Sequence, residues 1–128
     1  MIRIADALLD RKDEIIDANS FDIDAAKSKN LSEALIDRLI LNSERIDQIS
    51  MDVRNVANLD DPIGFMEDMR ILSNGLQVSR RRVPLGVIGA IFESRPNVIV
   101  DISVLCLKSG NSVILRGGSE AINSNSKI

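Results

Sequence analysis

The chain has 128 residues, of which 45% are hydrophobic and 27% are charged, and this composition indicates one globular domain. It contains no histidine and a single cysteine, Cys106. These counts exclude a Ser-His-Asp triad, imidazole or cysteine-cluster metal sites and intrachain disulfides, so we expect no metal and a reducing, cytoplasmic environment. With neither Trp nor Tyr, and no uninterrupted apolar stretch of roughly 20 residues, we expect no nucleic-acid partner and no membrane association.

Charge is distributed unevenly along the chain. Residues 1–68 contain 16 acidic and 8 basic side chains, whereas residues 69–128 contain 3 acidic and 8 basic ones. An anionic ligand would therefore meet the second half. An ordinary solvated helical surface in front of a sheet explains the same pattern equally well.

The first half is predicted to be helical. Apolar residues recur at helical spacing from Ile4 to Ile16, which predicts a helix of about four turns followed by a polar link over residues 19–30. Asn30 with Glu33 three residues later indicates a capping box at the start of a second helix. A third helix is predicted over residues 42–58.

The periodicity changes after residue 64. Residues 67–72 and 76–83 flank Ser73-Asn74-Gly75, and Asn-Gly favours a tight turn, so we predict an antiparallel hairpin. The nearly continuous apolar run 83–91 suits a strand covered on both faces. A helix buried on several sides is predicted over residues 97–109, and a strand over 112–115 is followed by a further helix from Glu120.

This order of elements predicts an α/β fold that begins an open parallel sheet with one βαβ unit. We expect three regions, a helical region over 1–66, the hairpin over 67–83 and the start of the sheet over 84–128. Parallel sheets need cover on both faces and more strands than these, so we expect most of an α/β domain to be missing. A frayed last helix or completion of the sheet by a dimer are the alternatives.

The turn Arg116-Gly117-Gly118-Ser119 is the first candidate site. It follows a strand and precedes a helix, where free backbone N–H groups and the helix dipole favour anions. Glycines allow close approach of a ligand, and an arginine can chelate a phosphate. Gly-Gly after a strand is also common in plain turns, so the pattern alone is weakly specific.

A second cluster, Glu93, Arg95 and Asn97, follows the apolar strand, where α/β enzymes place ligand contacts. Asn97 either caps its helix or donates an amide N–H to a developing oxyanion. Cys106 lies within an apolar helix and no histidine exists to activate it, so a structural role is favoured over a nucleophilic one.

Larger blocks of sequence carry a resemblance to a known family. Arg81–Val98, Leu105–Asn111 and Val113–Glu120 resemble the γ-glutamyl phosphate reductase family, also called glutamate-5-semialdehyde dehydrogenases, within the aldehyde dehydrogenase superfamily. Leu31–Leu39 and Val53–Val56 extend the likeness upstream. Glu93-Ser-Arg-Pro-Asn97 and Arg116-Gly-Gly-Ser-Glu120 are highly specific to that family. Its members are about three times longer, so the resemblance implies an amino-terminal portion of a Rossmann-type cofactor domain, without the catalytic domain.

The resemblance implies NADPH-dependent reduction of L-glutamate 5-phosphate, an acyl phosphate, to the semialdehyde in proline biosynthesis. Arg116, Gly117, Gly118, Ser119 and Glu120 fall where relatives hold the adenosine ribose, and an arginine there would suit the 2′-phosphate of NADPH. In this reading, the nucleophilic cysteine lies in a later segment absent from this chain, which alone would be inactive.

Further implications concern the substrate and partners. Asn97 corresponds to the superfamily's oxyanion asparagine, and Glu93 with Arg95 would contact the substrate. The hairpin resembles an oligomer-contact element, so a homo-oligomer is implied, with glutamate 5-kinase as a second partner. A non-catalytic nucleotide-binding module or a helical interaction module is the alternative.

Overall fold

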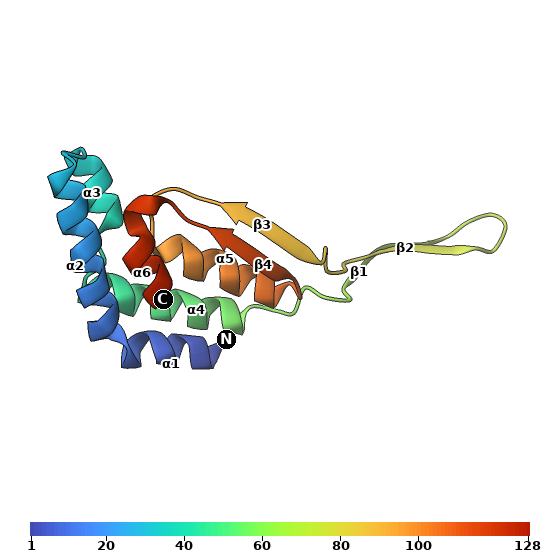
Figure 1. The fold of residues 1–128 in the computed structure, drawn as a ribbon. Coiled ribbons are helices and arrows are strands. Elements are labelled where there is room, and N and C mark those ends of the chain that lie inside the picture. The colour runs from blue at the N-terminus through green and yellow to red at the C-terminus, as the bar shows by residue number, and fades with distance from the viewer.

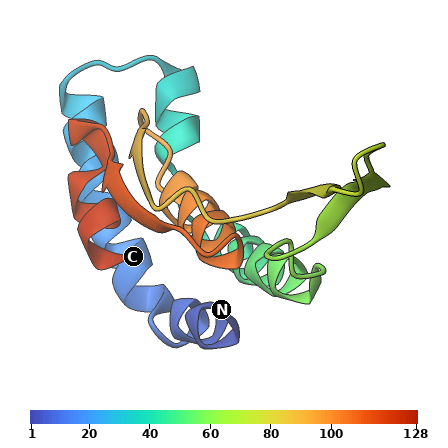
Figure 2. The same cartoon turned by 90° about the vertical axis from the view of Figure 1, so that its right-hand side faces the viewer.

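A computed structural model describes residues 1–128 as a helical body from which a long hairpin projects (Figures 1 and 2). The helices are α1 (Ile2–Asp10), α2 (Lys12–Ser28), α3 (Glu33–Leu39), α4 (Ser43–Asn58), α5 (Asn97–Lys108), the 3₁₀ turn η1 (Ser119–Ala121) and α6 (Ile122–Lys127). The strands are β1 (Met66–Ile71), β2 (Gln77–Arg81), β3 (Val87–Ile91) and β4 (Ser112–Arg116). No helix combines the length and apolar character needed to cross a membrane.

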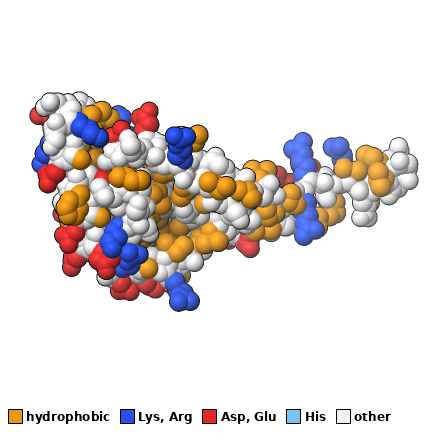
Figure 3. Space-filling view, in the orientation of Figure 1, with side chains coloured by type: hydrophobic (Ala, Val, Ile, Leu, Met, Phe, Trp, Pro, Cys, Tyr) orange, Lys and Arg blue, Asp and Glu red, His pale blue; other side chains and the backbone are white.

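The core lies where α1, α4 and α5 are stacked beneath the β3–β4 sheet (Figure 1). Helix α4 occupies the middle of this stack and packs on both α1 and α5. The main apolar cluster consists of Ala5, Leu8, Ile15, Leu41, Ile46, Ile49, Val53, Val100 and Val104. Helices α2, α3 and α6 form a second group at the end of the stack. Acidic side chains gather on this helical end and are sparse along the hairpin (Figure 3).

The predicted single helix over 4–16 and the polar link over 19–30 are both wrong. The first helix ends at Asp10, and α2 runs from Lys12 to Ser28 through the whole of the expected link. Asn19 and Asp22 lie on its buried face and are hydrogen-bonded to other segments. These two polar residues interrupt the apolar periodicity of α2, so the sequence pattern did not indicate a helix there. They can be buried because they have hydrogen-bond partners inside the protein.

The expected capping box at Asn30 is also wrong. Asn30 has φ +54° and ends α2, since its N–H bonds to Lys27 O (2.9 Å) and the next N–H, of Leu31, bonds to Ala26 O (3.1 Å). This is the Schellman arrangement, in which asparagine tolerates the left-handed conformation. Helix α3 begins later, after Ser32, whose side chain makes no capping hydrogen bond. The third predicted helix is confirmed as α4, with Asn42 as its N-cap.

The predicted hairpin is confirmed. Strands β1 and β2 pair antiparallel, with Met66 opposite Arg81 and Ile71 opposite Gln77. Gly75 in the connecting turn has φ +84°, a backbone conformation that favours glycine. The hairpin extends away from the body in both views, and its apolar side chains are exposed, as with Met66, Met69, Ile71 and Leu76.

The α/β class is confirmed by strands β3 and β4, which pair in parallel from Val87–Ser112 to Ile91–Arg116 with α5 as their crossover. Helix α5 covers one face of this pair (Figure 1). Within these residues the other face is bare, with Ile91 83% exposed, which agrees with the expectation that most of an α/β domain is missing. Helix α5 likewise buries only one side, because Leu105 and Leu107 face outward.

Candidate functional site at the carboxyl edge of the parallel strands

The loop after β3 and the turn after β4 meet at one edge of the sheet. The N–H of Phe92 bonds to Arg116 O at 3.0 Å, which continues the strand pairing past the end of β3. A Cβ built on Gly118 would lie 3.5 Å from Ser94 N and 3.6 Å from the carbonyl carbon of Glu93. Both distances are ordinary contacts, so the two backbones adjoin, and the structure brings Glu93 together with the Arg116–Glu120 segment.

The carboxylate of Glu120 connects the two segments. It accepts hydrogen bonds from Ser119 Oγ (3.2 Å) and Ser94 Oγ (3.4 Å). Its own backbone N–H holds the pKa of Glu120 below the usual value. The two hydroxyls and the charge of Lys29 lower the pKa further, whereas partial burial opposes them. Glu120 is therefore an anion at neutral pH, with hydroxyl donors already turned toward it.

Glu120 should make the stability of this edge depend on pH. A carboxyl whose pKa is lower in the folded protein stabilises the fold above its unfolded pKa, and that contribution is lost as pH falls through the folded value. We expect an NMR titration to give Glu120 a pKa below the ordinary value of a glutamate side chain. In Glu120→Gln, the loss of stability on acidification should be smaller than in the unchanged chain. An ordinary pKa for Glu120 would contradict this.

Arg116 is the last residue of β4, and its exposed side chain makes no ion pair or hydrogen bond. The unpaired guanidinium group of Arg116 thus lies at the same edge of the sheet as the Glu120 carboxylate. These donor and acceptor types fit a phosphorylated ribose, because guanidinium groups chelate phosphates and carboxylates accept ribose hydroxyls. Gly117 contributes by packing closely, since a Cβ there would lie 3.2 Å from the Phe92 ring.

The backbone amides at the start of α6 are not free, whereas those of Gly117 and Gly118 in the turn itself donate no hydrogen bond. Asp22 from α2 accepts from Asn123 N (3.1 Å) and Ser124 N (2.8 Å), and Ala121 N bonds to Gly118 O. An internal carboxylate therefore occupies the positive end of α6. An anion at this edge would therefore meet Arg116 and the amides of Gly117 and Gly118 rather than that helix terminus.

Arg95 adjoins this edge, because it lines a small hollow together with Glu93 and Ser94, whereas Asn97 does not line that hollow. Both line a cavity between α5 and the α3–α4 connection. Asn97 is the first residue of α5 and not its cap, which is Pro96, so the capping interpretation is wrong. Its amide donates to Asp101 Oδ2 at 3.1 Å. Burial raises the pKa of Asp101, the Asn97 hydrogen bond lowers it, and the nearby charge of Asp52 raises it further.

Comparison with known proteins identifies relatives of this chain. No family model matches the sequence. The chain is 56% identical over 125 residues to the γ-glutamyl phosphate reductase of Photobacterium profundum and 54% identical to that of Thermodesulfovibrio yellowstonii, covering 98% of this chain in both cases. The chain is homologous to the amino-terminal portion of γ-glutamyl phosphate reductases. It spans 30% of the length of these two relatives.

Solved structures of γ-glutamyl phosphate reductases agree with the fold described above. The crystal structure of the Thermotoga maritima enzyme matches 98% of this chain and 30% of its own, with 46% identity and a TM-score of 0.92. The Saccharomyces cerevisiae structure matches 94% of this chain and 31% of its own, with 38% identity and a TM-score of 0.88. Helices, hairpin and parallel strands therefore have the arrangement of the homologous part of these enzymes.

Two side chains at this strand edge were not singled out from the sequence. Ser94 sits inside the Glu93–Asn97 motif, where a hydroxyl between two charged residues gave no signal of its own. Asp22 was assigned to a link, and only the pairing of α2 with α6 reveals it as the cap. Cys106 is 6% exposed, as a structural cysteine should be. No group of three or more His, Cys, Asp or Glu could hold a metal ion.

Proposed function

We propose that the chain supplies the coenzyme-facing edge of an NADPH-dependent oxidoreductase that reduces L-glutamate 5-phosphate to L-glutamate 5-semialdehyde with release of phosphate, a step of proline biosynthesis. One observation supports this most. Arg116 and Glu120 stand together at the carboxyl edge of a parallel strand pair, in a chain that matches γ-glutamyl phosphate reductases over 98% of its length.

In this proposal the residues of the β4–α6 turn hold the coenzyme. Arg116 chelates the 2′-phosphate, and Glu120 accepts from ribose hydroxyls in place of the hydroxyls of Ser94 and Ser119. Gly117 and Gly118 allow the turn to pack closely, because a Cβ would lie 2.2 Å from Asn125 Nδ2 at the first position and 2.6 Å from Glu120 Oε2 at the second. Bound NADPH would supply the hydride for the reduction.

The substrate side is assigned to the β3–α5 loop. Glu93 and Arg95 are both exposed, so they are accessible to a soluble acyl phosphate. Asn97 would donate its amide N–H to the developing oxyanion. That donor now binds Asp101, so the amide must turn away from Asp101 to serve the reaction.

We further propose that residues 1–66 and 84–128 belong to the coenzyme-binding region and that the hairpin over 67–83 mediates homo-oligomer contacts. The exposed apolar side chains of β1 and β2 support the latter role. A cytoplasmic location and an association with glutamate 5-kinase complete the proposal. The unpaired, buried Cys106 agrees with a reducing compartment.

Titration of the 128-residue chain with NADPH and NADH tests the coenzyme site. We expect NADPH to bind more tightly, and Arg116→Gln to weaken NADPH binding by about tenfold while leaving NADH unchanged, because one charge-assisted pair is lost. Arg70→Gln, on an exposed hairpin position without an ion pair, is the matched control. Equal affinity for the two coenzymes, or no binding of either, would refute the role of Arg116.

A second assay tests the proposed division of labour. The chain supplied with NADPH and L-glutamate 5-phosphate should consume no NADPH and release no more phosphate than a protein-free control, because its single thiol, Cys106, is buried in α5 away from the strand edge. Phosphate release that disappears in Cys106→Ser would show that this cysteine is the nucleophile and would overturn the assignment.

A further inference from the structure

The C-terminal end of α2 lies beside the turn that follows β4, although the two segments are far apart in the sequence. Both views of the fold show the last turns of α2 next to η1 (Figures 1 and 2), and the two elements are in contact. Ala26 of α2 and Ala121 of η1 belong to one buried apolar cluster, in which they are 3% and 0% exposed. The last turn of α2 therefore adjoins the segment that carries Glu120.

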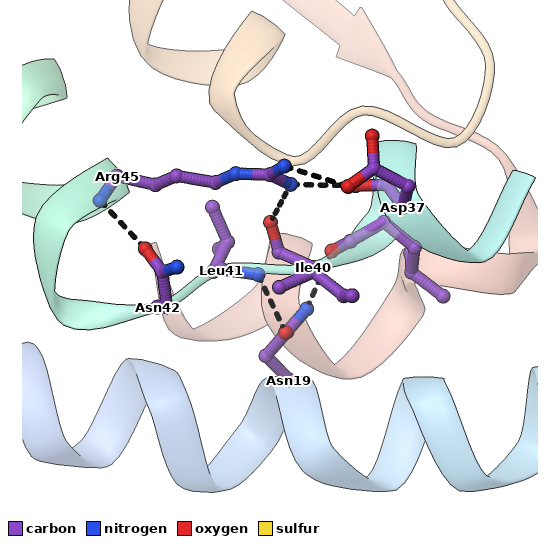
Figure 4. Close-up of polar contacts among 7 residues, drawn as sticks. Asn19, Asp37, Ile40, Leu41, Asn42 and Arg45 are labelled. Atoms are coloured by element: carbon purple, nitrogen blue, oxygen red, sulfur yellow. Dashed lines mark hydrogen bonds and ion pairs between the residues drawn. The ribbon is translucent and has the colours of Figure 1, made fainter. Parts of the chain in front are cut away.

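Two buried polar side chains fix α2 in this place. Asn19 accepts from Leu41 N at 2.7 Å and donates to Leu39 O at 2.8 Å, which joins α2 to the α3–α4 connection (Figure 4). Asp22 accepts from Ser124 N at 2.8 Å, which joins α2 to α6. Because both side chains are buried and have their hydrogen-bond partners on other segments, the end of α2 has a defined position relative to the β4–α6 turn.

Lys29 is the residue that follows α2, and it lies one helical turn beyond Ala26. Residues three apart share a face of a helix, so Lys29 extends the face of α2 that packs on η1. Its side chain is exposed and forms no ion pair. Hydrogen bonds from its own backbone and from two serine hydroxyls lower the pKa of Glu120, and the charge of Lys29 adds to them, so the ammonium group acts on this edge.

The edge thus has two cations without an ion-pair partner, Arg116 from β4 and Lys29 from α2. Arg95 and Glu93 line one small hollow beside the edge, so together they add no net charge. Glu120 offsets only one of the two unpaired cations, and a positive charge is left for a ligand. A phosphate monoester carries nearly two negative charges at neutral pH, so a single guanidinium group does not balance it.

We propose that Lys29 is a specificity-determining residue of the coenzyme site, where its ammonium group supplies the second positive charge for the 2′-phosphate of NADPH. The proposal rests on the proposed function, which assigns Arg116 to the same phosphate. Arg116 chelates through a planar guanidinium group, whereas Lys29 brings a point charge on a flexible stem that can move toward the anion. NADH carries a hydroxyl in place of this phosphate and gains nothing from Lys29.

Titration of the 128-residue chain with NADPH and NADH at low ionic strength, followed by coenzyme fluorescence, tests this. We expect Lys29→Gln to weaken NADPH binding about fivefold and to leave NADH binding unchanged, because an exposed charge contributes less than a chelating guanidinium group. The loss should shrink at about 1 M salt, which screens exposed charges. Lys29→Arg should keep the preference for NADPH. Lys27→Gln, on the same helix, exposed and without an ion pair, is the matched control.

An NMR titration without coenzyme measures the effect of Lys29 on the edge by itself. In Lys29→Gln the pKa of Glu120 should rise relative to the unchanged chain, because a nearby positive charge is removed, whereas Lys27→Gln should leave it as it is. Both lysines are exposed, so the variants should keep the fold, and their circular dichroism spectra verify that.

Three results would overturn the role of Lys29 alone: the same pKa of Glu120 in Lys29→Gln, an equal loss of affinity for both coenzymes, or an undiminished preference for NADPH. Failure of the unchanged chain to bind either coenzyme would instead refute the coenzyme site as a whole, and the role of Lys29 with it. Failure of this proposal is therefore distinguishable from failure of the proposed function.

Discussion

Replacing Asp22 with alanine is expected to lower the free energy of unfolding by about 3 kcal/mol. Asp22 is 2% exposed and accepts four hydrogen bonds, from the backbone N–H and side-chain amide of Asn123 and from the backbone N–H and hydroxyl of Ser124. Removing the carboxylate leaves buried donors without an acceptor and deprives α6 of its only side-chain cap.

Asp24→Ala is the matched control, because Asp24 lies two residues further along α2 and is exposed. Its unfolding free energy should change by no more than about 0.5 kcal/mol. Urea denaturation followed by circular dichroism measures both variants. If the two substitutions lower the free energy of unfolding equally, Asp22 is not the cap of α6, and other contacts hold the β4–α6 turn in place.

Replacing Gly110 with alanine should cost about 2–3 kcal/mol, the second largest effect. Gly110 has φ +72° after the end of α5, and an added Cβ would lie 2.7 Å from Ile63 Cδ1 and 2.9 Å from Pro84 Cγ. The substitution combines backbone strain with collision between two packed segments. The loss should appear in urea denaturation as a lower midpoint with an unchanged slope.

Gly75→Ala separates these two causes. Gly75 has a similar φ of +84°, but nothing lies within 4 Å of the position that a Cβ would take. Its substitution should therefore cost only the backbone strain, about 1 kcal/mol. Equal losses in the two variants would show that the contacts of Gly110 with Ile63 and Pro84 contribute nothing.

Elements whose local signals agreed with their surroundings were predictable from the sequence. Asn42 is followed by regularly spaced apolar residues, and α4 begins there. Asn74-Gly75 predicted the turn of the β1–β2 hairpin. A helix that ends before a glycine and lies between two apolar runs predicted the parallel pair of β3 and β4. The same reasoning failed where polar residues are buried. Asn19 and Asp22 resemble link residues until their partners on other segments are known.

The candidate site divides in the same way. Glu93, Arg116 and Glu120 come at or just after the ends of two predicted strands. Because the carboxyl ends of parallel strands lie at the same edge of a sheet, their place in the sequence was enough to predict that they share one edge. Asn97 could not be placed from its neighbours in sequence. The structure pairs it with Asp101, one helical turn along α5, and turns it toward the α3–α4 side. Spacing along a loop does not reveal which cavity each side chain enters.

The projecting hairpin has a consequence for how this molecule opens. Strands β1 and β2 pack chiefly on each other, and their side chains are largely exposed. An isolated two-stranded ribbon is marginally stable in water, so its amide protons should exchange with deuterium well ahead of those in α4. The β1–β2 hairpin is thus a unit that unfolds separately from the rest of the molecule. A protein surface that binds the hairpin would make it more rigid without altering the helical core.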